Sequence, residues 1–434
     1  MSTTTNRRVF LMQSGALGAG LCLGGFGRRS VGASANERLN IGVIGVGGQG
    51  ATDLNNVSGE NVAALCDIND QVLALAGERF PKARLYNDFR KMLEQRDLDA
   101  VTVSTPDHCH AVATTAALRL GKHVYCQKPL THSIHEARVV AAAAARVKTA
   151  TQMGNQGHSN ESTRVIVETL RAGVIGPVQE VHAWTDRPLW PHAVDRPNDT
   201  PAVPKGVHWD LWLGPAAARP YNPAYLPFKW RGWWDFGTGP LGDMACHLLD
   251  ASFWALDLSS PTSIEAECDS RNPETGPNWS VVNYRFPERN GLPPLTLTWY
   301  DGGKRPSRDL VHGRRVRENG VILVGEKGTM FIDDAYNGMF ALLPDEDFKG
   351  LKPPSPTLPR SPGHYFEWLD ACKTGSATGS NFAYAAALTE TILLGNLAVR
   401  VAGKIEWDAV AMKAKNCPEA DAILQPAYRP GWSL

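Results

Sequence analysis

An acidic and a histidine side chain stand four residues apart in the stretch GPLGDMACHLLD, at Asp243 and His247. Residues at positions i and i+4 share one face of a helix, so both side chains would point into the same space. A near-neutral imidazole suits the removal of a proton from a hydroxyl group, and a carboxylate can orient that hydroxyl. The same spacing also arises by chance on a protein surface or at a helix cap. Other motifs in the chain are therefore needed to show whether this pair is catalytic or structural.

A glycine-rich turn follows the short apolar run of residues 39–44 in the sequence RLNIGVIGVGGQG. In GxGxxG spacing the first glycine permits the tight turn, the second lets a pyrophosphate approach the backbone, and the third lets a helix pack on the strand. The phosphates then lie at the helix N-terminus. The residues predicted to bind the cofactor here are Gly45, Val46, Gly47, Gly48, Gln49 and Gly50.

A second apolar run, NVAALCDIN, ends in Asp67. A carboxylate at this place can accept hydrogen bonds from a ribose diol, and its charge repels a 2′-phosphate. The pattern therefore favours NAD over NADP. A glycine-rich turn in an unrelated α/β fold is the alternative interpretation.

Two further strands are predicted at residues 100–104 and 123–126, each followed by polar residues and a proline. Ligands of an open α/β sheet bind beyond the carboxyl ends of its strands. We therefore expect the residues that follow these strands to face the cofactor. They are Thr105, Pro106, His110, Gln127 and Lys128.

Length and charge limit the class of protein. A chain of 434 residues is long enough for two domains with good cores. The 44 basic and 44 acidic residues balance, and no basic stretch stands out, so nucleic acid is not an expected partner. The eight cysteines include no CxxC pair and imply no disulfide framework, and no Cys/His cluster has zinc-like spacing.

The first 35 residues resemble a twin-arginine export signal. Arg7 and Arg8 precede a weakly apolar, glycine-rich run, and the sequence ASA ends at Ala35. A short buried or membrane helix is the alternative, but the run is interrupted by glycines and short for a membrane span. We expect recognition by the export machinery, cleavage near Ala35 and a periplasmic or otherwise exported protein.

Four motifs occur in a fixed order along the chain: GVIGVGGQG, STPDHCHA, VYCQKPLT and GPLGDMACHLLD. They carry a resemblance to the Gfo/Idh/MocA family, which covers essentially the whole mature length of the chain. The resemblance implies an α/β protein with a Rossmann-type, doubly wound parallel sheet in residues 36–155. It implies a C-terminal α+β domain with a largely antiparallel sheet in residues 156–434, and a homo-oligomer. The family usually has Glu-Lys-Pro in the third motif, whereas Gln127 here removes a charge next to Lys128.

The second domain shows its own pattern after residue 155. Separated strand-like runs replace the α/β alternation, namely VQEVHAWTDRP, PTSIEAECDS, WSVVNYRFP and LTLTWYDG. A long helix is predicted over residues 381–403, packed between the two parts. The proline-rich residues 351–363 predict an extended surface loop.

The resemblance assigns catalytic roles residue by residue. It places Lys128, Asp243 and His247 beside the nicotinamide, with His247 taking the hydroxyl proton, Lys128 stabilising a developing alkoxide and Asp243 orienting the substrate and the imidazole.

Aromatic residues crowd the region before the Asp243 motif, where seven of the thirteen tryptophans fall between residues 184 and 234. Trp233, Trp234 and Arg231 are the best placed to form a floor for a sugar ring, although such rings also anchor sheets and subunit contacts. His158 follows the expected domain junction and is a candidate substrate contact, with an ordinary interdomain histidine as the favoured alternative. Nothing in the spacing demands a metal.

Three functions fit these residues. The first is an exported NAD-dependent oxidoreductase acting on a secondary hydroxyl of a sugar, polyol or glycoside. The second is redox-neutral glycoside cleavage, in which a hydride is removed and returned. The third, a dinucleotide-containing binding protein, is disfavoured because all three catalytic residue types are present. Export to a compartment without free NAD predicts a tightly held cofactor. Because too few residues precede the first strand to form an arm over the cofactor, we expect the binding site itself to retain it.

Overall fold

The structure of the protein is a computed structural model that describes residues 38–434. The arginine pair Arg7 and Arg8 and the expected cleavage point at Ala35 lie outside the described residues. The described part forms two β-sheets, one of six strands and one of nine. Its seven cysteines are all free thiols.

The first sheet is parallel, in the order β3-β2-β1-β4-β5-β6. This is the order of a doubly wound dinucleotide-binding sheet, which confirms the predicted fold class. The strand order reverses between β1 and β4, so a crevice opens beyond their carboxyl ends. The strands are β1 (Asn40–Ile44), β2 (Asn61–Cys66), β3 (Arg84–Tyr86), β4 (Ala100–Val103), β5 (His123–Cys126) and β6 (Thr151–Met153).

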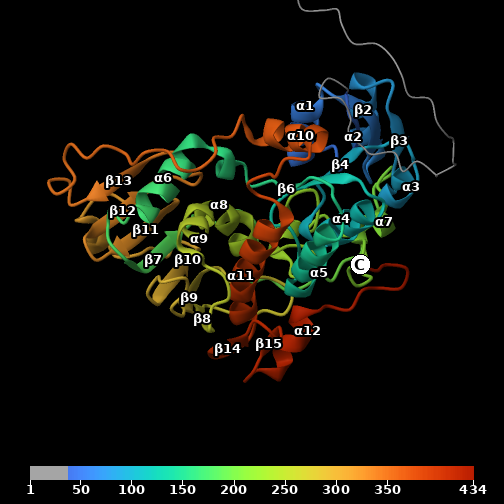
Figure 1. Cartoon of the computed structure of the whole chain (residues 1–434). Coiled ribbons are helices and arrows are strands. Elements are labelled where there is room, and N and C mark those ends of the chain that lie inside the picture. Colours follow the sequence, from blue (N-terminus) through green and yellow to red (C-terminus); the bar gives the residue numbers. More distant parts are fainter. Residues whose placement is uncertain (1–37) are drawn as a thin grey trace, which may run out of the picture.

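Helices cover both faces of this sheet (Figure 1). They are α1 (Gln49–Val57), α2 (Asp70–Arg79), α3 (Phe89–Leu93), α4 (His110–Arg119) and α5 (Ile134–Ala145). A further helix, α10 (His364–Thr374), returns from far along the chain and lies beside α1. Its residues Trp368 and Leu369 share a core cluster with Ile41 and Val43 of β1. The dinucleotide-type domain thus includes a helix that the chain supplies after most strands of the second sheet.

The second sheet has the order β13-β12-β11-β7-β10-β9-β8-β14-β15, and all its pairs are antiparallel except β7 with β10. Its strands are β7 (Val178–Trp184), β8 (Ser263–Cys268), β9 (Ser280–Phe286), β10 (Leu295–Tyr300), β11 (Gly320–Gly325), β12 (Gly328–Ile332), β13 (Phe340–Leu343), β14 (Ile405–Asp408) and β15 (Lys413–Ala414). The four predicted strand-like runs are β7 to β10, so those predictions are confirmed. Helices α6 (Glu161–Arg171), α8 (Cys246–Leu248), α9 (Asp250–Leu256) and α12 (Asp421–Leu424) also belong to this part of the chain, whereas α7 (Trp209–Leu213) lies beside the first domain (Figure 1).

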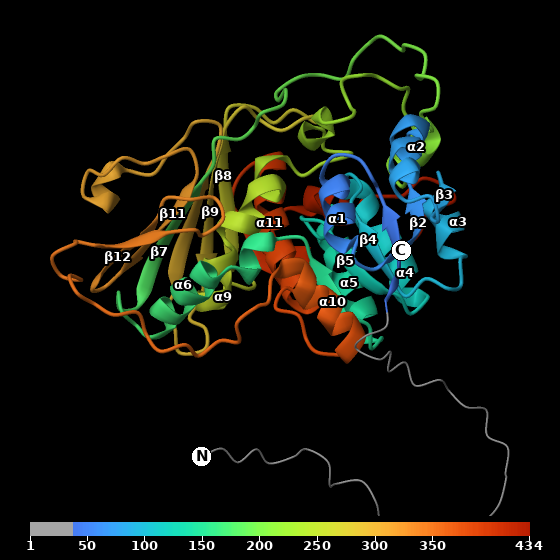
Figure 2. The ribbon, with the colours of Figure 1, turned by 90° about the horizontal axis from the view of Figure 1, so that it is seen from above.

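Helix α11 (Phe382–Arg400) lies between the two sheets, as predicted (Figure 2). The side chain of Asn381 accepts the N–H groups of Ala383 and Tyr384, which satisfies the first turn and fixes the start of the helix. By length and composition α11 resembles a membrane span. However, 78% of its apolar window is buried inside the protein, as expected of a core helix.

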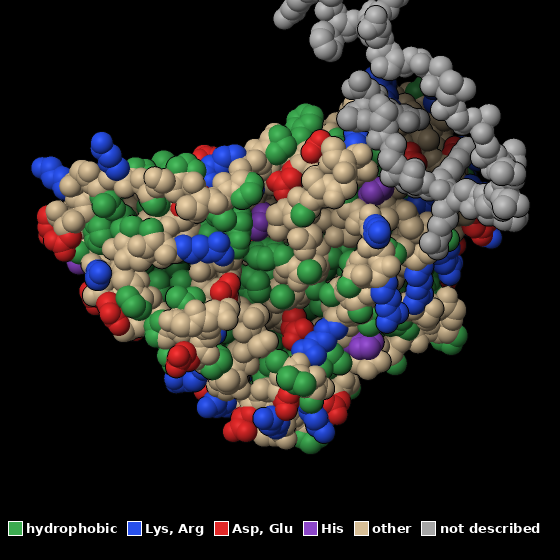
Figure 3. Space-filling view, in the orientation of Figure 1, with side chains coloured by type: hydrophobic (Ala, Val, Ile, Leu, Met, Phe, Trp, Pro, Cys, Tyr) green, Lys and Arg blue, Asp and Glu red, His purple; other side chains and the backbone are tan. Residues whose placement is uncertain are grey.

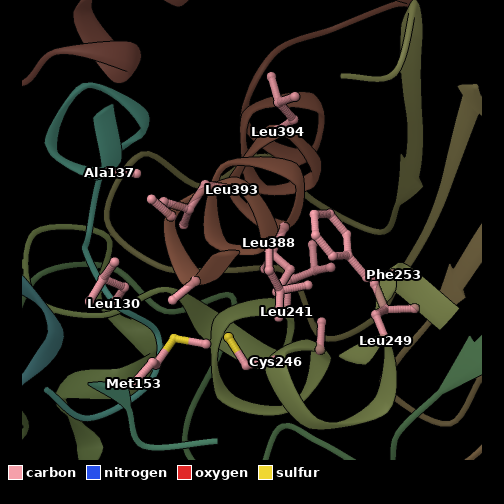
Figure 4. Packing of buried hydrophobic residues seen from close by; sticks show 14 of the residues in the cluster. Leu130, Ala137, Met153, Leu241, Cys246, Leu249, Phe253, Leu388, Leu393 and Leu394 are labelled. Atoms are coloured by element: carbon pink, nitrogen blue, oxygen red, sulfur yellow. The ribbon is translucent and has the colours of Figure 1, made fainter. Parts of the chain in front are cut away.

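The core around α11 also holds the chain segment that carries Asp243 and His247. Leu388 and Leu393 of α11 belong to the same buried cluster as Leu241, Cys246 and Leu249 (Figure 4). Residues flanking the acid and the histidine are therefore anchored in the interior. This anchoring leaves the two polar side chains little freedom to move.

The surface carries charges of both signs, interspersed over the face seen in Figure 3. This distribution agrees with the balanced composition. Residues 351–363 form no helix or strand and are largely exposed, which confirms the predicted surface loop.

Candidate active site

The glycine-rich turn joins β1 to α1 and forms one wall of the crevice. Gly45 has a φ of +83°, and a Cβ there would lie 2.5 Å from the carbonyl oxygen of Ser104. A Cβ at Gly50 would collide with the carbonyl oxygen of Gly45. Only glycine therefore allows the turn to lie this close to β4, and the N-terminus of α1 is left open to a phosphate group.

Asp67 lies directly beyond β2 and is held by the backbone. Its Oδ2 accepts the N–H of Val46 at 3.0 Å, and its Oδ1 accepts the N–H of Asn69 at 3.0 Å. Burial raises the pKa of Asp67, and these backbone N–H groups oppose the rise. The carboxylate is fixed beside the glycine turn, at the place where a dinucleotide-binding sheet holds a ribose diol.

A cavity of about 700 Å³ runs along the carboxyl ends of the strands. Its volume suits a dinucleotide, and the donor set of turn, helix N-terminus and carboxylate fits NAD. Val46 and Gly50 are buried and do not line the cavity. The predicted residues that line it are Gly45, Gly47, Gly48, Gln49, Asp67, Thr105, Pro106, His110, Gln127, Lys128, Arg231 and Asp243.

A second cavity of about 430 Å³ adjoins the first. Four residues line both: Gln49, Gln127, Lys128 and Asp243. These residues mark the boundary between a dinucleotide compartment and an outer compartment. His247 lines the outer one, so the structure brings it together with Lys128 and Asp243.

Lys128 and Asp243 are hydrogen-bonded across the domain junction. The ammonium Nζ donates to the carboxylate Oδ1 of Asp243 at 2.9 Å and to its carbonyl oxygen at 2.7 Å. Burial alone would raise the pKa of Asp243, but Lys128, Arg231 and Arg187 outweigh it and lower this pKa to about 2. Asp243 is therefore an ionised carboxylate throughout the physiological range.

Two arginines surround the same carboxylate. Arg187 Nε lies 3.3 Å from Asp243 Oδ2, and Arg231 Nε lies 3.7 Å from Oδ1. Arg231 was predicted to lie near the site. Arg187 follows β7 and belongs to no motif, so no sequence pattern marks it as part of the site.

His247 is 4% exposed, and its Nδ1 has no hydrogen-bond partner within residues 38–434. Burial and the nearby Lys128 lower its pKa to about 3. The imidazole is therefore neutral at physiological pH. Its ring packs edge-on against Tyr336, with 4.9 Å between the ring centroids. Tyr336 follows β12 and was not predicted.

The backbone between Asp243 and His247 differs from the expected helix start. Residues Leu241–Ala245 form a π-helical turn, and the short helix α8 follows it. A π-turn is wider than an α-turn and occurs often at functional sites. The two side chains still line one cavity, as the spacing predicted.

Gln127 belongs to a buried polar network centred on Asp53 of α1, a residue that no sequence motif singled out. The Gln127 amide donates to both carboxylate oxygens of Asp53, at 2.9 and 3.0 Å. Ser104 Oγ, Tyr365 OH and the Gln49 amide also donate to Asp53. A glutamate at position 127 would face the Asp53 carboxylate here, so an amide suits this network better than the glutamate of Glu-Lys-Pro would.

His110 was predicted to contact the cofactor and does line the larger cavity, but both nitrogens of its imidazole bond to the backbone. Nδ1 lies 2.7 Å from the carbonyl oxygen of Pro129, and Nε2 lies 2.9 Å from that of Thr105. Burial would lower the pKa of His110, but Cys126, Asp107 and the Pro129 carbonyl raise it to about 9. Both nitrogens therefore donate, and His110 ties together the loops beyond β4 and β5.

The predicted sugar floor of Trp233 and Trp234 is wrong. Trp233 is 3% exposed and donates to the carbonyl oxygen of Ala224, and Trp234 is 6% exposed and donates to that of Asn272. Neither ring lines either part of the site because both pack into the interior. Trp230 and Phe228 line the larger cavity instead.

His158 does not reach the site, so its prediction as a substrate contact is wrong. The residue is buried, its Nδ1 lies 3.0 Å from the carboxylate of Asp250, and its ring stacks on Trp254. His158 therefore packs within the second domain, away from both cavities. In the described part of the chain, no group of three His, Cys, Asp or Glu residues is arranged to hold a metal ion.

Comparisons with known proteins match both domains. Residues 39–155 match the Gfo/Idh/MocA family model described as an oxidoreductase family with an NAD-binding Rossmann fold. Residues 181–292 match the same family's C-terminal alpha/beta domain. Together the two matches cover more than half of the chain.

Individual relatives agree with this assignment. An inositol 2-dehydrogenase of Saccharopolyspora erythraea is 32% identical over 175 residues, 39% of this chain and 51% of that protein. A glycosyl hydrolase family 109 protein of Shewanella sp. (strain ANA-3) is 29% identical over 201 residues, 39% of this chain and 44% of that protein. The chain spans about half the length of these curated relatives.

Solved structures show the same fold. The WlbA dehydrogenase of Bordetella pertussis, solved with NADH and UDP-GlcNAcA, superposes with a TM-score of 0.62 at 15% identity. The match covers 86% of this chain and 99% of that one. The chain therefore belongs to the Gfo/Idh/MocA family of NAD-binding oxidoreductases.

Proposed function

We propose that the protein oxidises a secondary hydroxyl group of a sugar, polyol or glycoside with NAD as the hydride acceptor. The observation that carries this proposal is the meeting of Lys128, Asp243 and His247 where the two cavities adjoin. A substrate carbon held at this boundary has the dinucleotide compartment on one side. On the other side it meets an ammonium group, a carboxylate and a neutral imidazole.

Each side chain has a role that its surroundings support. His247 accepts the hydroxyl proton, because its imidazole lines the outer cavity together with Lys128 and Asp243 and is unprotonated at neutral pH. The Lys128 ammonium stabilises negative charge that develops on the substrate oxygen. Asp243, ionised and fixed by its neighbours, orients both the ammonium group and a substrate hydroxyl. NAD, when bound, supplies the acceptor for the hydride.

Redox-neutral cleavage of a glycoside is the second candidate. Oxidation of a ring hydroxyl acidifies the neighbouring C–H, a base removes that proton, and the glycosidic oxygen leaves. Addition of water and return of the hydride then give the free sugar, so the cofactor ends unchanged. The similarity to a glycosyl hydrolase family 109 protein supports this candidate, and the neutral His247 provides a base for the proton.

Export by the twin-arginine route forms part of the proposal and rests on Arg7, Arg8 and the residues after them. A protein exported after folding carries its cofactor with it. Because the receiving compartment is not expected to supply NAD, a reaction that restores the cofactor within the site fits best. Export therefore favours redox-neutral turnover over net dehydrogenation.

Product analysis separates the two reactions. The purified protein is mixed with glycosides, polyols and free sugars, and products and the absorbance of reduced nicotinamide are followed together. Free sugar without net NADH indicates cleavage, whereas a keto product with stoichiometric NADH indicates dehydrogenation. His247→Gln should abolish either reaction, and His135→Gln, a change on α5 away from both cavities, should not. An equally active His247→Gln variant would refute the proposed roles.

A further inference from the structure

A segment far from the glycine turn in sequence reaches the dinucleotide cavity. Residues 425–434 leave α12 and run back along the first domain, so the chain end marked C lies beside that domain in both views (Figures 1 and 2). Trp432 of this segment lines the 700 Å³ cavity. The motifs that identify the family do not include it.

The position of Trp432 within the cavity is defined by its neighbours. Its ring centroid lies 5.9 Å from that of Phe89, and the Arg90 guanidinium lies 4.4 Å from its ring centroid. Phe89 and Asn87 line the same cavity, and the Asn87 amide donates to the carbonyl oxygen of Asp67. Trp432 therefore lies at the end of the cavity where Asp67 would hold the adenosine ribose.

Several hydrogen bonds hold the segment in this place. Arg429 donates from Nε to the carbonyl oxygen of Gly214 and from Nη1 to the carboxylate of Asp210, each at 2.5 Å. Tyr428 donates to the buried carboxylate of Glu136. Arg119 of α4 donates to the carbonyl oxygen of Leu434 at 2.6 Å. Residues before and after Trp432 are thus held by hydrogen bonds, which keeps its indole beside the cavity.

We propose that Trp432 is a cofactor-binding residue that closes the adenosine end of the cavity and slows dissociation of the dinucleotide. This inference rests on the proposed use of NAD. An indole beside a purine pocket stacks favourably with the base and shields it from water. Tight retention of the dinucleotide then depends on residues 425–434 as well as on the glycine turn and Asp67.

The test measures nucleotide exchange rather than turnover. Protein loaded with NAD is mixed with isotopically labelled NAD, and the bound nucleotide is followed by mass spectrometry. Trp432→Ala should exchange about 5- to 150-fold faster than the wild type, the range expected for loss of one base–aromatic stack. Trp432→Phe keeps a ring and should exchange at close to the wild-type rate. Trp279→Ala, which removes a partly exposed tryptophan of the second domain, is the matched control and should change nothing.

A second readout locates the effect. Trp432→Ala should weaken binding of ADP-ribose by a similar factor and leave binding of nicotinamide mononucleotide unchanged, because only the first carries adenine. Exchange within twofold of the wild type, or equal weakening of both fragments, would overturn the role of Trp432. A wild-type protein that binds no NAD at all would instead refute the proposed function, so the two failures are distinguishable.

Discussion

Replacing Gln127 with glutamate tests the charge arrangement beneath the catalytic lysine. The amide nitrogen of Gln127 lies 2.9 and 3.0 Å from the two oxygens of Asp53, which is fully buried. A carboxylate at this distance from another is repelled by about 5 kcal/mol at an effective dielectric constant of 20. Protonating the new carboxyl at pH 7 instead costs about 4 kcal/mol, given an ordinary glutamate pKa of about 4.3.

The smaller of these two costs sets the expected loss of stability. A hydrogen bond from the introduced carboxyl, once protonated, to Asp53 returns about 1 kcal/mol, so Gln127→Glu should lower the free energy of unfolding by about 2–4 kcal/mol at pH 7. The introduced carboxyl has a folded-state pKa above its unfolded one. The loss is therefore absent below about pH 4 and grows as the pH rises through the folded-state pKa.

Urea unfolding between pH 4 and 8 measures this loss. Exchanging the two groups in Asp53→Asn/Gln127→Glu restores one carboxylate facing one amide and should recover at least half of the stability at pH 7. Gln71→Glu, an exposed change in the first turn of α2, is the matched control. If Gln127→Glu unfolds like the wild type across this pH range, or if the exchange recovers nothing, the network does not explain Gln127.

Three further predictions concern the site. Lys128→Ala should leave the amount of bound NAD unchanged and abolish turnover, and nucleotide content and reaction rate measured on one sample will show both. Full activity of this variant would refute the catalytic role of Lys128. Asp67→Ala should weaken NAD binding and relax discrimination against NADP, because the repelling carboxylate is lost, and unchanged selectivity in titrations would mean that Asp67 does not face the ribose. The pKa of His247 is depressed to about 3, so the unfolded state gains a proton below about pH 6.5 that the folded state does not. His247→Gln should therefore lose part of the acid destabilisation between pH 6.5 and 3, and urea midpoints that fall as steeply as in the wild type would contradict the buried, neutral state.

Local pattern was sufficient for the dinucleotide-binding turn of the first domain. The glycine turn, the strand before it and Asp67 lie within thirty residues, and their geometry follows from one βαβ unit. The Lys128, Asp243 and His247 constellation was accessible because a family motif carries each residue. Strands β7 to β10 were accessible because their apolar alternation is clear.

Site residues that long-range packing brings together could not be predicted from the sequence. Tyr365 reaches Asp53 from a helix more than three hundred residues away, and Arg187 reaches Asp243 from an irregular loop, so no local pattern marks either. The tryptophan predictions failed for a related reason. Aromatic residues satisfy a core as well as a binding site, and only the packing of the loops decides which rings are buried.

The nucleotide content of the purified protein tests the central claim most directly. The protein is isolated without added nucleotide, denatured, and the released compounds are identified and counted by mass spectrometry, with Asp67→Ala treated in parallel. We predict close to one NAD or NADH per wild-type chain and much less in the variant. A wild-type protein that carries no nicotinamide nucleotide, and whose activity appears only on adding micromolar to millimolar NAD, would contradict a tightly held cofactor. Failure to bind NAD even when it is added would contradict the account of the site.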